Sequence, residues 1–241
     1  MDHHVNQSGR QKVDADLRAP LRWLFAPRCV VCGDPGLPDR DLCAACHAQL
    51  PWQGPACTRC ALPLPQAGIC GHCLQHPPPL AAVHAAFDYA FPVDALLPRL
   101  KFHHDFAAGR VLVQSMCAQF AGLERATTLV PLPLHRSRLR RRGYDQALEL
   151  ARPLARALRI PLRPELLQRQ RATAAQSTLD ATARKRNLRG AFTVPTGAAL
   201  PEHVTLFDDV MTTGATLHAA AEALRKAGVA QVEAWVCARV A

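Results

Sequence analysis

The stretch that decides the fold is Val204-Thr-Leu-Phe-Asp-Asp-Val-Met-Thr-Thr-Gly-Ala-Thr216. Its first half predicts a buried strand that ends in two adjacent carboxylates, Asp208 and Asp209. A loop with threonine hydroxyls and a glycine then opens a predicted helix. Backbone N–H groups at a helix start bind phosphate, and carboxylates accept hydrogen bonds from vicinal hydroxyls. The stretch therefore favours a sugar-phosphate site over an acidic turn with a threonine N-cap, which needs no ligand.

Strands and helices alternate around this stretch. The hydrophobic pattern predicts helices over residues 93–102, 109–122, 145–158 and 215–227. It predicts strands over residues 83–90, 127–131, 203–208 and 231–240. This order is typical of a parallel α/β sheet flanked by helices, in which ligands bind at the carboxyl ends of the strands.

Eight of the ten cysteines form four Cys-x-x-Cys units separated by ten, ten and nine residues. Two such units complete a tetrahedral Cys₄ zinc site with no position left for water, so we expect two structural zinc ions. Pairing of neighbouring units is favoured over a cross-brace, although the spacing allows both. The predicted ligands are Cys29, Cys32, Cys43, Cys46, Cys57, Cys60, Cys70 and Cys73. The remaining two, Cys117 and Cys237, are interpreted as core residues.

Charge is distributed unevenly along the 241 residues. The formal net charge is +10, and residues 81–200 alone carry 19 basic and 8 acidic side chains, a net of +11. Five arginines fall within seven residues between Arg136 and Arg142, in what the sequence predicts to be a loop. Guanidinium groups suit phosphate oxygens, so a polyanionic partner is favoured over a solvated basic surface.

The first 19 residues are polar and are expected to be disordered, without the apolar core of a secretory signal. No apolar run reaches the length of a membrane helix, so the expected location is the cytoplasm. The prolines at 77–79 predict a linker over residues 77–80, which separates a zinc-ribbon module at 20–76 from a domain at 81–241.

The stretch 204–216 resembles the phosphoribosyl-pyrophosphate (PRPP) signature of type I phosphoribosyltransferases. Further motifs resemble the ComF family (the ComFC/GntX-like proteins), namely Val130-Pro-Leu-Pro-Leu-His-Arg136, Arg142-Gly-Tyr-Asp-Gln146 and Leu100-Lys-Phe102. So does the series Gln176, Arg184, Asn187 and Phe192. The resemblance implies a double zinc ribbon joined to a domain of the type I phosphoribosyltransferase fold.

The resemblance also implies roles for individual residues. Asp208 and Asp209 would contact the ribose hydroxyls, as the catalytic pair. The residues implied to bind PRPP are Thr212, Thr213, Gly214, Ala215, Thr216, Lys101, Arg142 and Arg184. Residues 169–189 resemble a mobile hood loop over the substrate. The family usually has asparagine where this chain has Asp145, and that aspartate is instead a candidate cap for the following helix.

Two functions from different classes follow. In the first, the protein binds Mg²⁺–PRPP and transfers its phosphoribosyl group to a nitrogen acceptor. In the second, it is a non-catalytic protein that handles single-stranded DNA in natural transformation, as the family resemblance implies. Aromatic residues make up only 5% of the chain and do not interleave with the arginines, which disfavours base stacking. A zinc module that contacts proteins of a DNA-uptake machine is a third hypothesis.

Overall fold

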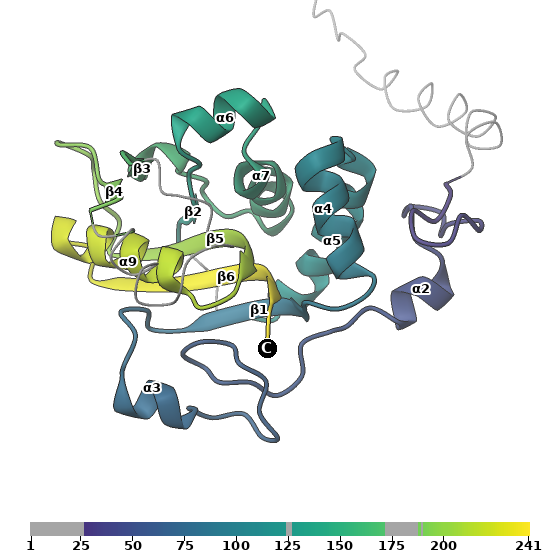
Figure 1. The fold of residues 1–241 in the computed structure, drawn as a ribbon, viewed down its shortest axis with the longest axis horizontal. Coiled ribbons are helices and arrows are strands. Elements are labelled where there is room, and N and C mark those ends of the chain that lie inside the picture. The colour runs from purple at the N-terminus through teal and green to yellow at the C-terminus, as the bar shows by residue number, and fades with distance from the viewer. Residues whose placement is uncertain (1–26, 124–126, 172–187, 189) are drawn as a thin grey trace, which may run out of the picture. The chain divides into compact units, whose positions relative to one another are not determined.

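The structure is a computed structural model that describes residues 27–123, 127–171, 188 and 190–241 (Figure 1). The chain divides into two compact units, one up to Gln49 and one from Leu50 onwards. The smaller unit contains one zinc-ribbon half with the short helix α2 (Ala44–Ala48). The larger unit contains the other half and the α/β sheet.

Four parallel strands form the sheet of the larger unit, in the order β1-β6-β5-β2. Their bounds are β1 Val83–Asp88, β2 Leu129–Pro131, β5 His203–Met211 and β6 Gln231–Arg239. The two central strands, β5 and β6, are buried over most of their length, because helices cover both faces of a parallel sheet. The predicted parallel α/β architecture is confirmed.

Alternate residues of each strand point to opposite faces of the sheet. On one face Trp235 of β6 stacks on Phe120 of α5 (Phe106–Phe120), with ring centroids 4.7 Å apart. On the other face Ala234 and Val236 belong to the same apolar cluster as Leu217 and Leu224 of α9. Helix α5, with α7 (Gln146–Leu158) packed beside it, therefore covers one face, and α9 (Ala215–Ala227) covers the other.

The remaining elements surround the sheet's carboxyl end. Helix α4 precedes α5 and packs against it, and α6 leads from β2 into α7 (Figure 1). Their bounds are α4 Val93–His103, α6 Arg136–Arg142, α7 Gln146–Leu158 and α9 Ala215–Ala227. A 3-10 turn and a two-stranded antiparallel ribbon complete the unit: η1 Pro164–Leu166, β3 Gln168–Arg169 and β4 Phe192–Thr193.

The arginine-rich stretch is a helix, α6, and the prediction of a loop was wrong. Arginine is a good helix former, and the ends of the helix carry clear signals. His135 Nδ1 accepts a hydrogen bond from Ser137 N at the start, and Gly143 has a φ of 81° at the end. A helix places residues four apart on one face, which decides which arginines can act together.

The half of the zinc ribbon in the larger unit packs onto the sheet. It includes α3 (Gly71–Gln75) and contributes Ala61 to the apolar cluster beneath α9. Cys237 is fully buried in β6, as predicted, whereas Cys117 lies half-buried on α5. No helix among the described residues is both long enough and apolar enough to span a membrane.

Candidate functional site

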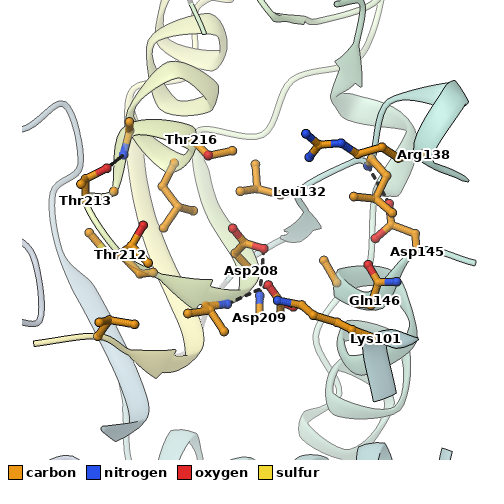
Figure 2. A pocket seen from close by; sticks show the side chains of 18 of the residues that line it. Lys101, Leu132, Arg138, Asp145, Gln146, Asp208, Asp209, Thr212, Thr213 and Thr216 are labelled. Atoms are coloured by element: carbon orange, nitrogen blue, oxygen red, sulfur yellow. Dashed lines mark hydrogen bonds and ion pairs between the residues drawn. The ribbon is translucent and has the colours of Figure 1, made fainter. Parts of the chain in front are cut away.

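A cavity of about 380 Å³ opens at the carboxyl end of the sheet, where parallel α/β proteins bind ligands. Three parts of the chain form most of its lining: the end of β5 with the loop into α9, the segment from β2 through α6 into α7, and the end of α4. Tyr89, Arg169 and Val240 complete it. Figure 2 shows the charged and hydroxyl side chains of these parts pointing toward a shared space.

The acidic pair lies at the end of β5. Because successive strand residues alternate between faces, Asp208 and Asp209 point to different sides of the sheet. Asp209 Oδ2 lies 2.5 Å from the Nζ atom of Lys101, which reaches it from α4 (Figure 2). Burial lowers the pKa of Lys101, but the attraction of Asp209 outweighs it and the pKa is raised. Lys101 is therefore a half-buried charged partner of the carboxylate pair.

Asp208 lies beside Asp209 at the end of β5 and also lines the cavity. Burial, and then repulsion by the Asp209 carboxylate, raise the pKa of Asp208 well above its ordinary value, although Lys101 opposes this. The Asp208 Oδ1 atom accepts a hydrogen bond from the Asp209 amide at 2.9 Å. An ionised Asp208 would be stabilised by hydroxyl donors or by a cation in the cavity.

The loop between β5 and α9 forms a cradle of backbone amides. Gly214 precedes α9 with a φ of 76° and has no side chain to cap this helix, while the Ala215 amide lies 3.5 Å from Thr213 Oγ1. A Cβ atom at Gly214 would lie 2.5 Å from Met211 Cε and 3.1 Å from His218 Nε2. The hydroxyl-bearing residues Thr212 and Thr213 are exposed beside it. Open amides, hydroxyls and a required glycine are features of a phosphate-binding turn.

The opposite wall of the cavity is basic. Arg138 and Arg142, four residues apart on α6, both line it, and so does Arg169 of β3. Arg142 Nη1 donates to Gln146 Oε1 at 2.7 Å, which fixes the guanidinium against the start of α7. The remaining α6 arginines, Arg136, Arg140 and Arg141, are exposed and do not line the cavity.

Asp145 connects the start of α7 to the segment that follows β2 through hydrogen bonds. Its Oδ2 atom accepts from the Leu134 amide at 2.7 Å, and its Oδ1 atom accepts from the Leu148 amide at 3.3 Å. The aspartate thus caps α7, as the sequence indicated, and also holds the segment that follows β2. Burial raises the pKa of Asp145.

Most of the residues singled out from the sequence that the structure describes line one cavity. Asp208, Asp209, Thr212–Thr216, Lys101 and Arg142 all line it, whereas Arg184 lies outside the described residues, as do Gln176 and Asn187. Phe192 is buried in β4. Arg169, Gln146 and Tyr89 also line the cavity. In the sequence Arg169 begins the hood-like stretch and Gln146 ends the Arg142–Gln146 motif, but neither is assigned a ligand role, and Tyr89 fits a strand core as well as a base-stacking position.

An aromatic cluster adjoins the basic wall. The guanidinium of Arg142 lies 5.2 Å from the ring centroid of Phe102, which is 61% exposed at the end of α4. Tyr144 packs against Phe106 and His104, and its hydroxyl donates to the Leu100 carbonyl. Aromatic rings and arginines that are separate along the chain are therefore neighbours in space.

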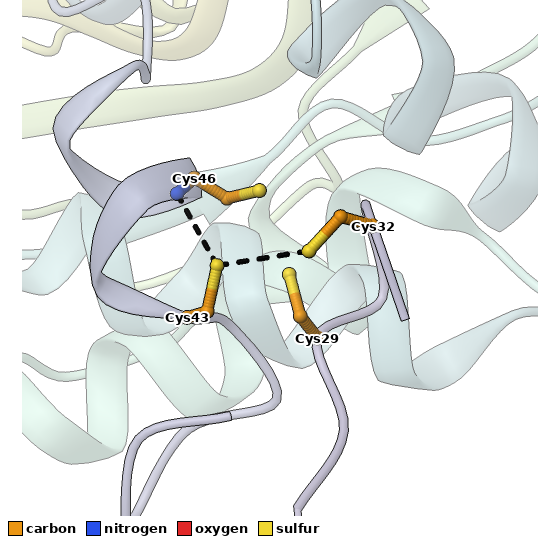
Figure 3. A group of neighbouring side chains, drawn as sticks. All are labelled: Cys29, Cys32, Cys43 and Cys46. Atoms are coloured by element: carbon orange, nitrogen blue, oxygen red, sulfur yellow. Dashed lines mark hydrogen bonds between the residues drawn. The ribbon is translucent and has the colours of Figure 1, made fainter. Parts of the chain in front are cut away.

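The eight clustered cysteines form two sets of four neighbouring thiols. In each set the four sulfur atoms lie within 4.8 Å of one another, the spacing that a single metal ion requires. Figure 3 shows the set in the smaller unit, Cys29, Cys32, Cys43 and Cys46. The larger unit holds Cys57, Cys60, Cys70 and Cys73. Each set thus combines two Cys-x-x-Cys motifs that are neighbours in the sequence, so the sequential pairing is correct and the cross-brace is excluded.

The thiols of each set cannot all ionise by themselves. Burial opposes ionisation of Cys29, yet backbone amides lower its pKa to about 6. Burial and then the neighbouring thiols raise the pKa of Cys46, and burial does the same for Cys73. A divalent cation would allow four thiolates to lie together, so both sets fit zinc.

The parallel sheet, the acidic pair at the end of β5 and the amide cradle at α9 define a protein of the type I phosphoribosyltransferase fold. A solved orotate phosphoribosyltransferase from Aeropyrum pernix is 21% identical, with 56% of this chain and 60% of that chain covered. The TM-score of this match is 0.34.

The chain belongs to the ComF family. It is 35% identical over 222 residues to the DNA utilization protein YhgH of Escherichia coli K12, with 88% of this chain and 96% of that protein covered. It is 33% identical over 225 residues to competence protein F of Haemophilus influenzae, with 89% and 98% covered. Residues 20–74 match the double zinc ribbon domain.

Proposed function

We propose that the protein binds Mg²⁺–PRPP in the cavity and transfers its phosphoribosyl group to a nitrogen acceptor. The observation that carries this proposal is the convergence of three chemically different surfaces on one space. The α9 cradle suits a phosphate, Asp208 and Asp209 suit vicinal hydroxyls, and the opposite arginines suit a second anionic group. PRPP has these three groups in that order.

In this proposal each end of the ligand lies against one wall of the cavity. The 5-phosphate accepts hydrogen bonds from the amides and hydroxyls of Thr212–Thr216, and the ribose hydroxyls donate to Asp208 and Asp209. The pyrophosphate lies toward Arg138, Arg142 and Arg169, whose guanidinium groups pair with phosphate oxygens. Lys101 holds Asp209 in place and adds positive charge beneath the ligand.

The donor set also fits a hard divalent cation. Asp208 and Asp209 present carboxylate oxygens to the cavity, and burial together with the Asp209 carboxylate raises the pKa of Asp208, an effect that a bound cation would oppose. Mg²⁺, when bound with PRPP, supplies neutralisation of the pyrophosphate leaving group.

The chemistry that follows needs positioning more than it needs a strong base. The bond from the ribose C1 to pyrophosphate breaks, and its electron pair leaves with the pyrophosphate oxygen. A nitrogen lone pair then forms the new bond to C1, and the nitrogen loses a proton. The arginines of α6 and β3 stabilise the departing charge, while Asp208 and Asp209 keep the ribose oriented.

Titration calorimetry with Mg²⁺–PRPP tests the binding step, with Gly214→Ala as the site variant. We expect saturable binding by the wild type and binding at least about tenfold weaker in the variant, because the added Cβ enters the phosphate cradle and strains a positive φ. Gly122→Ala is the matched control, since a Cβ there meets nothing within 4 Å. A wild type that does not bind PRPP would sink the proposal.

Single-stranded DNA handling is the second candidate function, and the Phe102–Arg142 contact favours it. Phosphate contacts combined with exposed aromatic faces are the usual means of binding single strands. The names of the relatives, which refer to DNA utilization and competence, support the same candidate function.

Fluorescence anisotropy with a labelled oligothymidine tests this candidate. Phe102→Ala should weaken binding about fivefold or more, because one stacked base is lost, and should leave the salt dependence unchanged, because the phosphate contacts remain. Phe91→Ala is the control, since that ring is also exposed, at 63%, but lies outside the cluster. Equal effects of the two variants, or no binding at low salt, would rule the candidate out.

A further inference from the structure

The zinc ribbon of the larger unit is built into the sheet rather than tethered to it. The Val83 amide at the start of β1 donates to the Thr58 carbonyl within the ribbon at 2.9 Å. Gln53 donates from Nε2 to the Ala61 carbonyl and accepts on Oε1 from the Ala85 amide. The ribbon and the sheet therefore share backbone hydrogen bonds as well as an apolar core.

Arg239, the last residue of β6, joins this ribbon to the candidate site. Its Nε atom donates to the carbonyl of Cys60 at 2.8 Å, and its Nη1 atom lies 3.4 Å from the carbonyl of Met211. The residue is only 8% exposed. One buried guanidinium thus contacts the backbone of a zinc ligand and the last residue of β5.

Met211 directly precedes the phosphate cradle. The Val240 amide also donates to the Met211 carbonyl, at 3.0 Å, so this carbonyl receives donors from two neighbouring residues. The Met211 side chain packs so closely on Gly214 that a Cβ there would overlap it. A shift of Met211 is therefore transmitted directly to the turn that opens α9.

We propose that Arg239 is a positioning residue that couples the second zinc site to the phosphate cradle. With zinc bound by Cys57, Cys60, Cys70 and Cys73, the Cys60 carbonyl would be held in one position. Arg239 donates to this carbonyl and to that of Met211, so it fixes Met211 relative to the zinc site. The cradle next to Met211 then keeps the conformation that binds phosphate. This inference rests on the proposed function, because it concerns the 5-phosphate end of the same ligand. It assigns a function in ligand binding to the zinc ribbon of the larger unit.

The test separates the two ends of the ligand by titrating ribose 5-phosphate and Mg²⁺–pyrophosphate independently. Arg239→Met should weaken ribose 5-phosphate binding about tenfold, because two hydrogen bonds from a charged donor are lost. Pyrophosphate binding should stay within about twofold, because its arginines lie on the opposite wall. Arg239→Lys, which keeps one donor, should recover part of the loss. Arg110→Met, an exposed arginine on α5, is the control.

A second arm tests the route through zinc. The Cys57→Ser/Cys60→Ser variant, at a temperature where circular dichroism shows it folded, should also lose affinity for ribose 5-phosphate. Combining it with Arg239→Met should add little further loss, since both changes break the same chain of contacts. If the cysteine variant does not fold, the results for Arg239→Met and Arg239→Lys alone decide whether Arg239 positions the cradle.

The outcomes distinguish this inference from the proposed function. Equal weakening of both ligands by Arg239→Met would indicate a general loss of structure and would overturn the coupling. No change in either ligand, or no recovery with lysine, would overturn it as well. A wild type that binds neither ligand would instead overturn the proposed function, on which the coupling depends.

Discussion

The Asp208→Asn/Asp209→Asn double variant is expected to lose Mg²⁺–PRPP binding by about a hundredfold or more. Asparagine keeps the size of each side chain but removes two charged acceptors, and a hydrogen bond to a charged group contributes about 1.5–3 kcal/mol. It also removes the negative charge that a magnesium ion requires. Titration calorimetry measures the loss. The control is Glu202→Gln/Glu222→Gln, which changes the same net charge at two exposed positions.

The single Asp208→Asn variant separates binding from stability. Because the folded-state pKa of Asp208 is raised, its contribution to stability is present below the unfolded pKa and is lost as pH rises through the folded value. At neutral pH, asparagine should therefore leave the free protein as stable or more stable, while Mg²⁺–PRPP binding weakens. Wild-type affinity should rise with pH through the raised pKa of Asp208, since the ligand favours the ionised form. A variant that loses stability and affinity together would contradict this account.

The part of the site that one continuous stretch encodes was predictable from the sequence. Val204–Thr216 carries its own strand pattern, acidic pair and phosphate turn, and each depends on neighbours a few residues away. The two zinc sites were equally predictable, because the spacing of each set of four cysteines reflects the coordination geometry of one metal ion. The strand and helix order followed from the same local periodicity.

The other wall of the cavity depends on contacts between distant residues. Lys101 meets Asp209 only because α4 packs near the end of β5, and Arg169 reaches the cavity from β3. The arginine-rich stretch has a single apolar residue, Leu139, which is too few to reveal a helical period, so the sequence did not show that Arg138 and Arg142 share a face. The absence of interleaved aromatics argued against base stacking, yet Phe102 lies beside Arg142 across 40 positions of sequence.

Loss of the second zinc ion is expected to destabilise the whole larger unit. Cys57, Cys70 and Cys73 form a buried cluster, and the neighbouring Ala61 lies in the core beneath α9. Cys57→Ser/Cys60→Ser removes two ligands and leaves two buried thiols without their cation. Structural zinc contributes about 10–16 kcal/mol in small domains that fold around it. A loss of roughly 5 kcal/mol here would lower the melting temperature of the larger unit on the order of 10–20 °C.

The matched variant, Cys29→Ser/Cys32→Ser, removes the same two ligand types from the smaller unit. Its cysteines belong to the other compact unit, so the main calorimetric transition should move by no more than about 2 °C. Zinc released from each variant, measured with a colorimetric chelator, should be half that of the wild type in both. Equal thermal shifts in the two variants would contradict this prediction, because the stability of the sheet would then depend equally on the zinc sites of the larger and the smaller unit. A large shift confined to the second set would mean that this ribbon is structurally part of the α/β domain, which is the condition that zinc-dependent positioning of the phosphate cradle requires.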